Sequence, residues 1–203
     1  MSDGSTTCAG KAFAIQWFHG KTLLICPLHL LGPGAGYPTY IEAKDVPEKV
    51  SSIDVLDFTG KSVVATAQHG LLRTGWPVEK ARGDITGDMM AFELQSGSRM
   101  PILALAPNLV PVGTKVWVLS KNMPATSQEV ERFPGVVTRS FNTGVTIALD
   151  GKLTAMGSSG SPVVNAKNEV VCMMVGKESL ERTTIMGIPS NVLYARLCQE
   201  IPR

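Results

Sequence analysis

The 203-residue sequence has no block of basic residues, and its formal net charge is only +2. Nucleic acid and anionic membrane surfaces are therefore not expected partners, because both are bound through clustered positive charge. No apolar run approaches the roughly 20 residues that a membrane helix needs, so no membrane segment is expected. The opening stretch MSDGSTTCAG lacks the basic flank and apolar run of a secretory signal. We therefore expect a cytoplasmic protein unless a leader has been removed.

The four cysteines, at positions 8, 26, 172 and 198, include no C-x-x-C pair. A structural zinc site needs clustered thiolates, so no metal is expected, and no motif implies an organic cofactor. Cys26 and Cys172 lie in apolar runs, where cysteine usually packs as a small hydrophobic side chain. The sequence leaves the disulfide state open.

Charged residues make up only 18% of the chain and hydrophobic residues 44%, which favours a folded domain over disorder. Short runs rich in Val, Ile, Thr and aromatic residues predict strands at 11–18, 21–26, 61–67, 88–94, 114–120, 135–140, 143–150, 161–165 and 169–176. Segments 19–21 and 141–144 are typical of tight turns, and 32–38 and 121–135 of longer loops. The stretch 95–113 is expected to connect two β halves.

One helix is predicted, over residues 190–201. Ser190 is the expected N-cap. Apolar residues recur at helical spacing, which gives the helix one face that can pack on a core: Val192 or Leu193, Leu197 and Ile201. Many short strands followed by a late helix indicate a barrel or a sandwich.

The run GSSGSP at 157–162 combines small residues with a proline just before Val163. It is either a plain turn or a place where backbone N–H groups converge on a substrate oxygen while a hydroxyl attacks. A hydroxyl becomes a nucleophile when an imidazole takes its proton and a carboxylate orients that imidazole. Of the three histidines, His29 and His69 each follow an apolar run, whereas His19 lies in a turn and is expected to be solvated.

The stretches GKAFAIQWFHGKTLLICPLHLL, GDMMAFEL and GSSGSPVV, in that order, resemble the trypsin-like (chymotrypsin-fold) serine peptidases. The resemblance extends over NEVVCMMVG and IMGIPSNVLYARL and covers about residues 8 to 200. It implies an all-β fold of two six-stranded antiparallel β-barrels with a C-terminal α-helix. The whole chain would form one peptidase domain, with an N-terminal barrel over about 8–100, a C-terminal barrel over about 110–189 and the helix at 190–201.

The resemblance also implies roles for individual residues. Ser159 would be the nucleophile, His29 the general base and then the general acid, and Asp88 the acid that orients His29. The backbone N–H groups of Gly157 and Ser159 would form the oxyanion hole.

Two other residues compete for these roles. Asp84 is the alternative acid, but Asp88 is favoured because it opens the apolar run MMAFEL, which would hold it rigidly. His69 as the base would leave barely the length of a strand before Asp88, so His29 is favoured.

The sequence departs from the family pattern around both motifs. Pro27 precedes His29 by two residues, so the strand must be leaving its hydrogen-bond ladder there. Ser158 replaces the usual acidic residue before the nucleophile, which argues against activation by a newly cut amino terminus. By alignment with the family, Leu153 would form the floor of the primary substrate pocket, and Val175 and Lys177 a wall. An apolar floor predicts apolar or small residues before the cleaved bond.

Three hypotheses follow. The first is an active serine endopeptidase that acts on a protein or peptide substrate. The second is a trypsin-like fold that no longer cuts and binds proteins or peptides instead. The third is an unrelated β-sandwich in which the motifs are coincidental.

Overall fold

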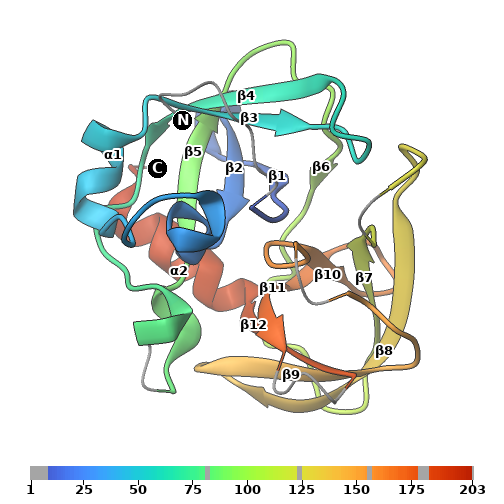
Figure 1. Cartoon of the computed structure of the whole chain (residues 1–203). Helices are drawn as coiled ribbons and strands as arrows, with labels where there is room; N and C mark the ends of the chain where they lie inside the picture. Colours follow the sequence, from blue (N-terminus) through green and yellow to red (C-terminus); the bar gives the residue numbers. More distant parts are fainter. Residues whose placement is uncertain (1–8, 81–82, 123–124, 155–156, 178–182, 203) are drawn as a thin grey trace.

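A computed structural model describes residues 9–80, 83–122, 125–154, 157–177 and 183–202. It shows two β-rich halves, with a helix that follows the last strand and packs against the first half (Figure 1). Cys8 and the start of the chain lie outside the described residues. No helix in the described ranges is long and apolar enough to cross a membrane.

The first half is a six-stranded sheet in the order β3-β4-β5-β2-β1-β6. Its strands are β1 (Phe13–Gln16), β2 (Thr22–Cys26), β3 (Ser52–Leu56), β4 (Val63–Gly70), β5 (Met90–Leu94) and β6 (Ile102–Leu103). Neighbouring strands pair antiparallel except β1 and β6, which are parallel. The short strand β6 lies in the segment that was predicted to connect the two halves.

The second half is a closed barrel in the order β10-β11-β12-β9-β8-β7. Its strands are β7 (Lys115–Ser120), β8 (Glu131–Phe141), β9 (Gly144–Leu149), β10 (Pro162–Val164), β11 (Val170–Lys177) and β12 (Thr184–Pro189). Closure leaves no free strand edge, which protects the barrel from edge-to-edge association.

Short helical turns occupy the connections of the first half. They are η1 (Phe18–Gly20), η2 (Leu28–Leu31), η3 (Pro33–Ala35), η4 (Ala43–Asp45), α1 (Val46–Lys49), η5 (Val78–Lys80) and η6 (Ile85–Gly87). Two of these turns position the candidate site: His29 lies within η2, and Asp88 directly follows η6.

The C-terminal helix α2 (Ser190–Glu200) joins a hydrophobic core that the first half shares with residues of β10, β11 and β12. Leu193, Leu197 and Ile201 are buried there, as their helical spacing predicted. The expected N-cap is wrong: Pro189 holds the cap position, and no side chain caps the helix. Ser190 is instead buried and donates its hydroxyl hydrogen to the carbonyl of Ala106, because a buried hydroxyl needs an acceptor.

The predicted fold class is confirmed, and all nine predicted strands overlap observed ones. The strands β3, β6 and β12 were not predicted. The strand β8 begins at Glu131, inside the predicted loop 121–135, and pairs there with Ser120 of β7.

Candidate active site

His29 lies directly after β2, where the chain leaves the sheet. Pro27 ends the strand because it has no backbone N–H to donate, and its φ of −67° leads into η2. The backbone N–H of His29 donates to Asp88 Oδ1 at 2.8 Å, and ring Nδ1 lies 2.6 Å from Asp88 Oδ2. Both carboxylate oxygens therefore contact the same residue, and together they fix the orientation of the imidazole ring.

Asp88 reaches His29 through the pairing of β2 with β5. In that antiparallel register Cys26 faces Met90, so continuing it past the strand ends brings residue 88 beside residues 28 and 29. The carboxylate is fully buried, while the His29 side chain is 13% exposed. A buried carboxylate is costly unless it is hydrogen-bonded, and the two contacts from His29 supply that compensation.

The environment of His29 raises its pKa above the ordinary value of 6.5. Burial alone would lower the pKa, but the hydrogen bond that His29 donates to Asp88 and the charges of Asp88 and Glu79 outweigh it. With its proton on Nδ1 facing Asp88, a neutral imidazole leaves the lone pair of Nε2 available to accept a proton.

The alternative acid, the alternative base and the third histidine lie elsewhere. Asp84 Oδ1 accepts from the backbone N–H of Thr86 at 2.9 Å and from its hydroxyl at 2.7 Å, so Asp84 caps η6. His69 is exposed at an irregular point of β4 with φ of 55°, and His19 is exposed in the turn η1. The structure therefore brings Asp88, and not Asp84, to His29.

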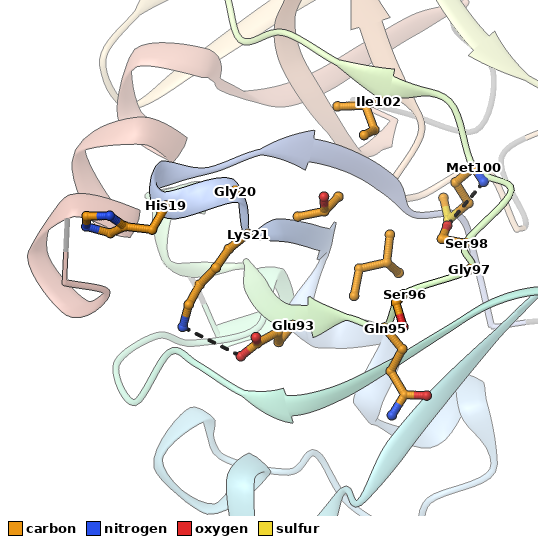
Figure 2. Close-up of a pocket in the computed structure, with 12 residues that line it drawn as sticks. His19, Gly20, Lys21, Glu93, Gln95, Ser96, Gly97, Ser98, Met100 and Ile102 are labelled. Atoms are coloured by element: carbon orange, nitrogen blue, oxygen red, sulfur yellow. Dashed lines mark hydrogen bonds and ion pairs between the residues drawn. The ribbon is translucent and has the colours of Figure 1, made fainter.

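A separate hollow lies beside His19 (Figure 2). Its lining includes Lys21 and Glu93, whose charged atoms are 3.8 Å apart and largely exposed. Such an exposed pair contributes little energy and orients no imidazole. His29, Asp88 and Ser159 do not line this hollow.

The candidate nucleophile Ser159 lies in the turn before β10 and is partly exposed. Its carbonyl accepts from the N–H of Lys11 at 2.7 Å, and the next residue, Gly160, donates to the carbonyl of Met174 at 2.7 Å. The Ser159 hydroxyl donates to the carbonyl of Val175 at 3.1 Å. The turn is thus held between β11 and the residues that precede β1.

The two neighbouring serines have structural partners. Ser158 is buried and donates to the carbonyl of Thr154, and Ser161 is buried and donates to the hydroxyl of Ser120 at 2.8 Å. Of the three serines in the run, Ser159 alone is partly exposed.

Two glycines give the turn its shape. Gly157 has φ of +75° and faces open space, and Gly160 has φ of +90°. A side chain at Gly160 would collide with the carbonyl of Lys11 and lie 2.9 Å from the Pro27 ring. Within the described residues, no hydrogen bond occupies the N–H groups of Gly157 and Ser159, the predicted oxyanion donors.

The turn of Ser159 packs against the segment that carries His29. Gly160 lies against Pro27, two residues before His29, and Gly10 lies between the Leu30 side chain and the carbonyl of Ser159. In the described part of the chain no hydrogen bond joins Ser159 to His29, because the hydroxyl points to Val175. Such bonds are often absent until substrate binds.

The residues predicted to line the substrate pocket lie on the barrel. Leu153 is buried in the barrel core. Val175 is buried on β11 and contacts Ser159 through its carbonyl, and Lys177 is half-buried at the end of the same strand. Leu153 thus precedes the turn in sequence, and β11 contacts the turn through the Val175 carbonyl.

Three residues of the site were not foreseen. Lys11 and Gly160 hold the turn of Ser159, and Glu79 contributes negative charge near His29. In the sequence, the repeated glycines of the run GSSGSP could have indicated the role of Gly160. Within the described ranges no three His, Cys, Asp or Glu side chains come together as a metal site.

A closed barrel, a second six-stranded sheet and a C-terminal helix define the trypsin-like fold. The chain is similar to the active form of the Rv3671c protease from M. tuberculosis, with a TM-score of 0.58 and 13% identity over 95% of this chain and 73% of that one. The inactive form gives 0.54 and 12% over 95% and 83%. A serine-to-alanine mutant in its inactive form gives 0.55 and 11% over 94% and 80%. No protein-family model and no curated protein sequence matches the chain.

Proposed function

We propose that this protein is a serine endopeptidase that hydrolyses peptide bonds of a protein or peptide substrate through an acyl-enzyme. The observation that carries the proposal is the double contact between His29 and the fully buried carboxylate of Asp88. The partly exposed Ser159 lies on a turn packed against the same segment. The likeness in fold to a protease supports the same interpretation.

In the first step Ser159 attacks the substrate carbonyl. The Ser159 hydroxyl leaves the carbonyl of Val175 and donates its hydrogen bond to Nε2 of His29 instead. As Oγ bonds to the carbonyl carbon, its proton passes to Nε2 of His29. Asp88 stabilises the resulting imidazolium through the bond to Nδ1 and takes no proton itself.

The tetrahedral intermediate carries a negative charge on the former carbonyl oxygen. The N–H groups of Gly157 and Ser159 donate to it, and loss of one such donor costs about 3 kcal/mol of transition-state stabilisation. When the peptide bond breaks, His29 gives the proton to the leaving amine. Water then attacks the acyl ester with His29 as the base, and the acid product and the Ser159 hydroxyl are released.

The substrate pocket is assigned to Leu153, Val175 and Lys177. An apolar floor at Leu153 cannot balance a buried basic side chain, so apolar or small residues are preferred before the scissile bond. The whole chain forms one peptidase domain in this proposal, with barrels over about 8–100 and 110–189 and the helix at 190–201. Cleavage of an unbiased peptide mixture, read by mass spectrometry, tests the preference.

A fluorophosphonate probe tests the proposal because it phosphonylates only an activated serine. We expect labelling of the wild type that is lost in Ser159→Ala. Ser158→Ala and Ser161→Ala are matched controls, since both hydroxyls are buried and bonded elsewhere, and both variants should label. Labelling that survives Ser159→Ala would assign the nucleophile to another residue.

The second candidate function is a peptide-binding module that does not cut. The contact of the Ser159 hydroxyl with Val175, rather than with His29, favours it. A folded wild type that resists the probe while binding peptides from the same mixture would support this alternative.

A further inference from the structure

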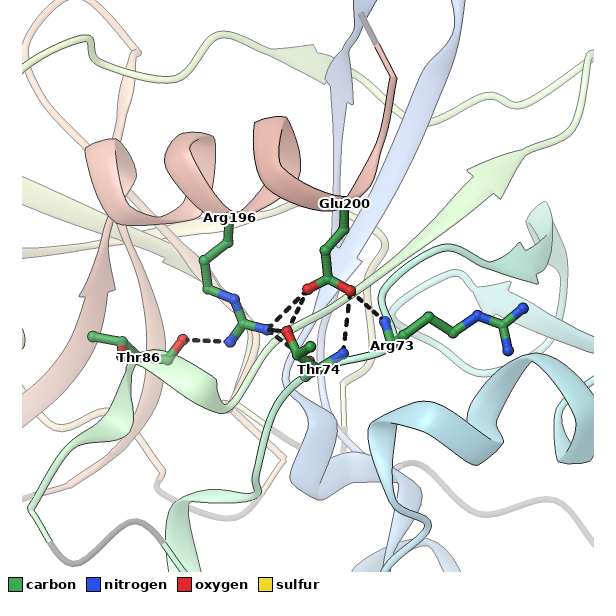
Figure 3. Close-up of polar contacts among 5 residues, drawn as sticks. All are labelled: Arg73, Thr74, Thr86, Arg196 and Glu200. Carbon is green, nitrogen blue, oxygen red and sulfur yellow. Dashed lines mark hydrogen bonds and ion pairs between the residues drawn. The ribbon is translucent and has the colours of Figure 1, made fainter.

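The helix α2 carries a polar cluster, made of Arg196 and Glu200, that faces two segments of the first half (Figure 3). One segment contains Arg73 and Thr74, and the other contains Thr86 in η6. The Arg196 and Glu200 side chains are only 12% and 14% exposed. Contacts this well shielded from water are stronger than surface ion pairs.

Arg196 joins the two segments. Its Nη2 donates to the Thr74 carbonyl at 2.6 Å and to the Thr74 hydroxyl at 3.0 Å, and its Nη1 donates to the Thr86 carbonyl at 3.0 Å. The planar guanidinium can reach both carbonyls at once because its donors diverge in a rigid fork. A lysine ammonium has no such geometry.

The Thr86 carbonyl belongs to the turn that ends at Asp88. The Asp88 N–H donates to the carbonyl of Ile85 at 3.1 Å, and the Gly87 carbonyl accepts from Trp76 at 3.1 Å. The Trp76 ring covers Gly87, where a side chain would collide with it. The carbonyls of Ile85, Thr86 and Gly87 are therefore each held by a neighbour, and Arg196 is the neighbour supplied by α2.

We propose that Arg196 is a positioning residue for Asp88, acting from the C-terminal helix through the Thr86 carbonyl and the turn η6. The inference rests on the proposed function, because it concerns the acid that orients His29. Asp88 must present both oxygens to one residue, so a small rotation of its backbone breaks one of two short contacts with His29. A misplacement of about 1 Å at such a site can cost on the order of 100-fold in rate.

Glu200 pairs with Arg196 at 3.4 Å within this cluster but makes no direct contact with η6 in the described ranges. Its carboxylate accepts from the N–H groups of Arg73 and Thr74 at 2.5 and 3.1 Å and from the Thr74 hydroxyl. It has no contact with Thr86 among the described residues. If the cluster only docked α2, replacing Glu200 or Arg196 would have similar effects on the site. If Arg196 positions Asp88, replacing Arg196 should affect the site much more than replacing Glu200.

The test compares Arg196→Met with two controls, Glu200→Gln and Arg132→Met. Arg132 lies on β8 of the barrel, donates to Asn168 at 3.0 Å and lies over Trp117, so it matches the chemical change with contacts outside η6. The first readout is the rate of fluorophosphonate labelling. The second is the pKa of His29 from NMR titration, assigned with His29→Gln, which reports the Asp88 contact without requiring turnover.

We expect Arg196→Met to label about 10- to 100-fold more slowly and the pKa of His29 to fall, because the contacts with Asp88 loosen. Both controls should stay within about twofold of the wild type and keep its His29 pKa. Arg196→Lys keeps the charge and replaces Arg196→Met in the test if the methionine variant does not fold. Its labelling rate and His29 pKa should lie between those of Arg196→Met and those of the controls.

Three results would overturn the proposal: an unchanged His29 pKa and labelling rate in Arg196→Met, an equal change in Glu200→Gln, or full activity in Arg196→Lys. A wild type that does not label contradicts the proposed function instead. In that case the NMR titration still decides whether Arg196 positions Asp88.

Discussion

The two parts of the candidate site are held in different ways. The His29–Asp88 pair is assembled by strand pairing, buried, and joined by two short contacts. The Ser159 turn is held through its backbone, while its hydroxyl points to Val175. The proposed acid–base pair is thus preorganised by the sheet, whereas the proposed nucleophile lies on a turn shaped by glycines, with its hydroxyl directed to Val175.

The largest effect is expected from breaking the preorganised pair. Asp88→Asn keeps the size of the side chain but presents an amide N–H to the ring, which disfavours the tautomer with the proton on Nδ1. The labelling rate and peptide turnover should fall by about 10⁴-fold. Asp84→Asn serves as the control, since the asparagine side-chain oxygen can still accept from Thr86 and keep the cap of η6. A similar loss in both variants would contradict the assignment of Asp88.

The next effect concerns the backbone of the nucleophile turn. Gly160→Ala places a side chain at φ of +90° against the Lys11 carbonyl and Pro27, whereas Gly157→Ala faces open space at φ of +75°. Left-handed backbone alone costs roughly 1–2 kcal/mol for an L residue. Urea unfolding should therefore show about that loss for Gly157→Ala and a clearly larger one for Gly160→Ala. Equal losses would mean that the Lys11 and Pro27 contacts do not constrain the turn.

The dependence on pH distinguishes the chemistry of His29 from its contribution to stability. The base must be neutral, so the labelling rate should rise with pH and level off above the pKa of His29, which lies above 6.5. The groups that raise this pKa are Asp88 and Glu79. Because the folded pKa is the higher one, the pair stabilises the fold fully below pH 6.5 and loses this contribution as pH rises through the folded pKa.

The two curves therefore run in opposite directions over the same pH range. Urea unfolding at a series of pH values, with His29→Gln as the reference, gives the stability curve. A labelling rate that does not change across this range would exclude His29 as the base.

The smallest effect concerns Cys26, which lies beside the pair. Burial, with a smaller contribution from the charge of Asp88, raises its pKa from 9.0 to about 12, so roughly 1,000-fold less thiolate is present than for an exposed thiol. Iodoacetamide should leave Cys26 unmodified in the native protein and alkylate it in urea. Peptide mass spectrometry measures the difference, and rapid native alkylation would contradict the burial.

Much of the fold was predictable because the strands have clear local patterns. The missed strands have weaker ones: β3 contains Asp54, β6 has only two residues, and β12 contains Gly187 and Pro189. The Ser190 error arose because a serine before a helix resembles a cap, while its actual partner, Ala106, is distant in sequence.

The site was only partly predictable for a similar reason. Asp88 and His29 were named from the family resemblance, since no local pattern reports a pairing across 59 residues. The contacts of Gly160 with Lys11 and of Arg196 with Thr86 depend on tertiary packing, so no single stretch of sequence indicates them.

The most direct measurement is a crystal structure of the protein after reaction with a fluorophosphonate. The account predicts a bond from Ser159 Oγ to phosphorus, with the phosphoryl oxygen accepting from the N–H groups of Gly157 and Ser159. Nε2 of His29 should lie within hydrogen-bond distance of the adduct, with Nδ1 still bonded to Asp88. An adduct on another residue, or one on Ser159 with the His29 ring turned away, would contradict it.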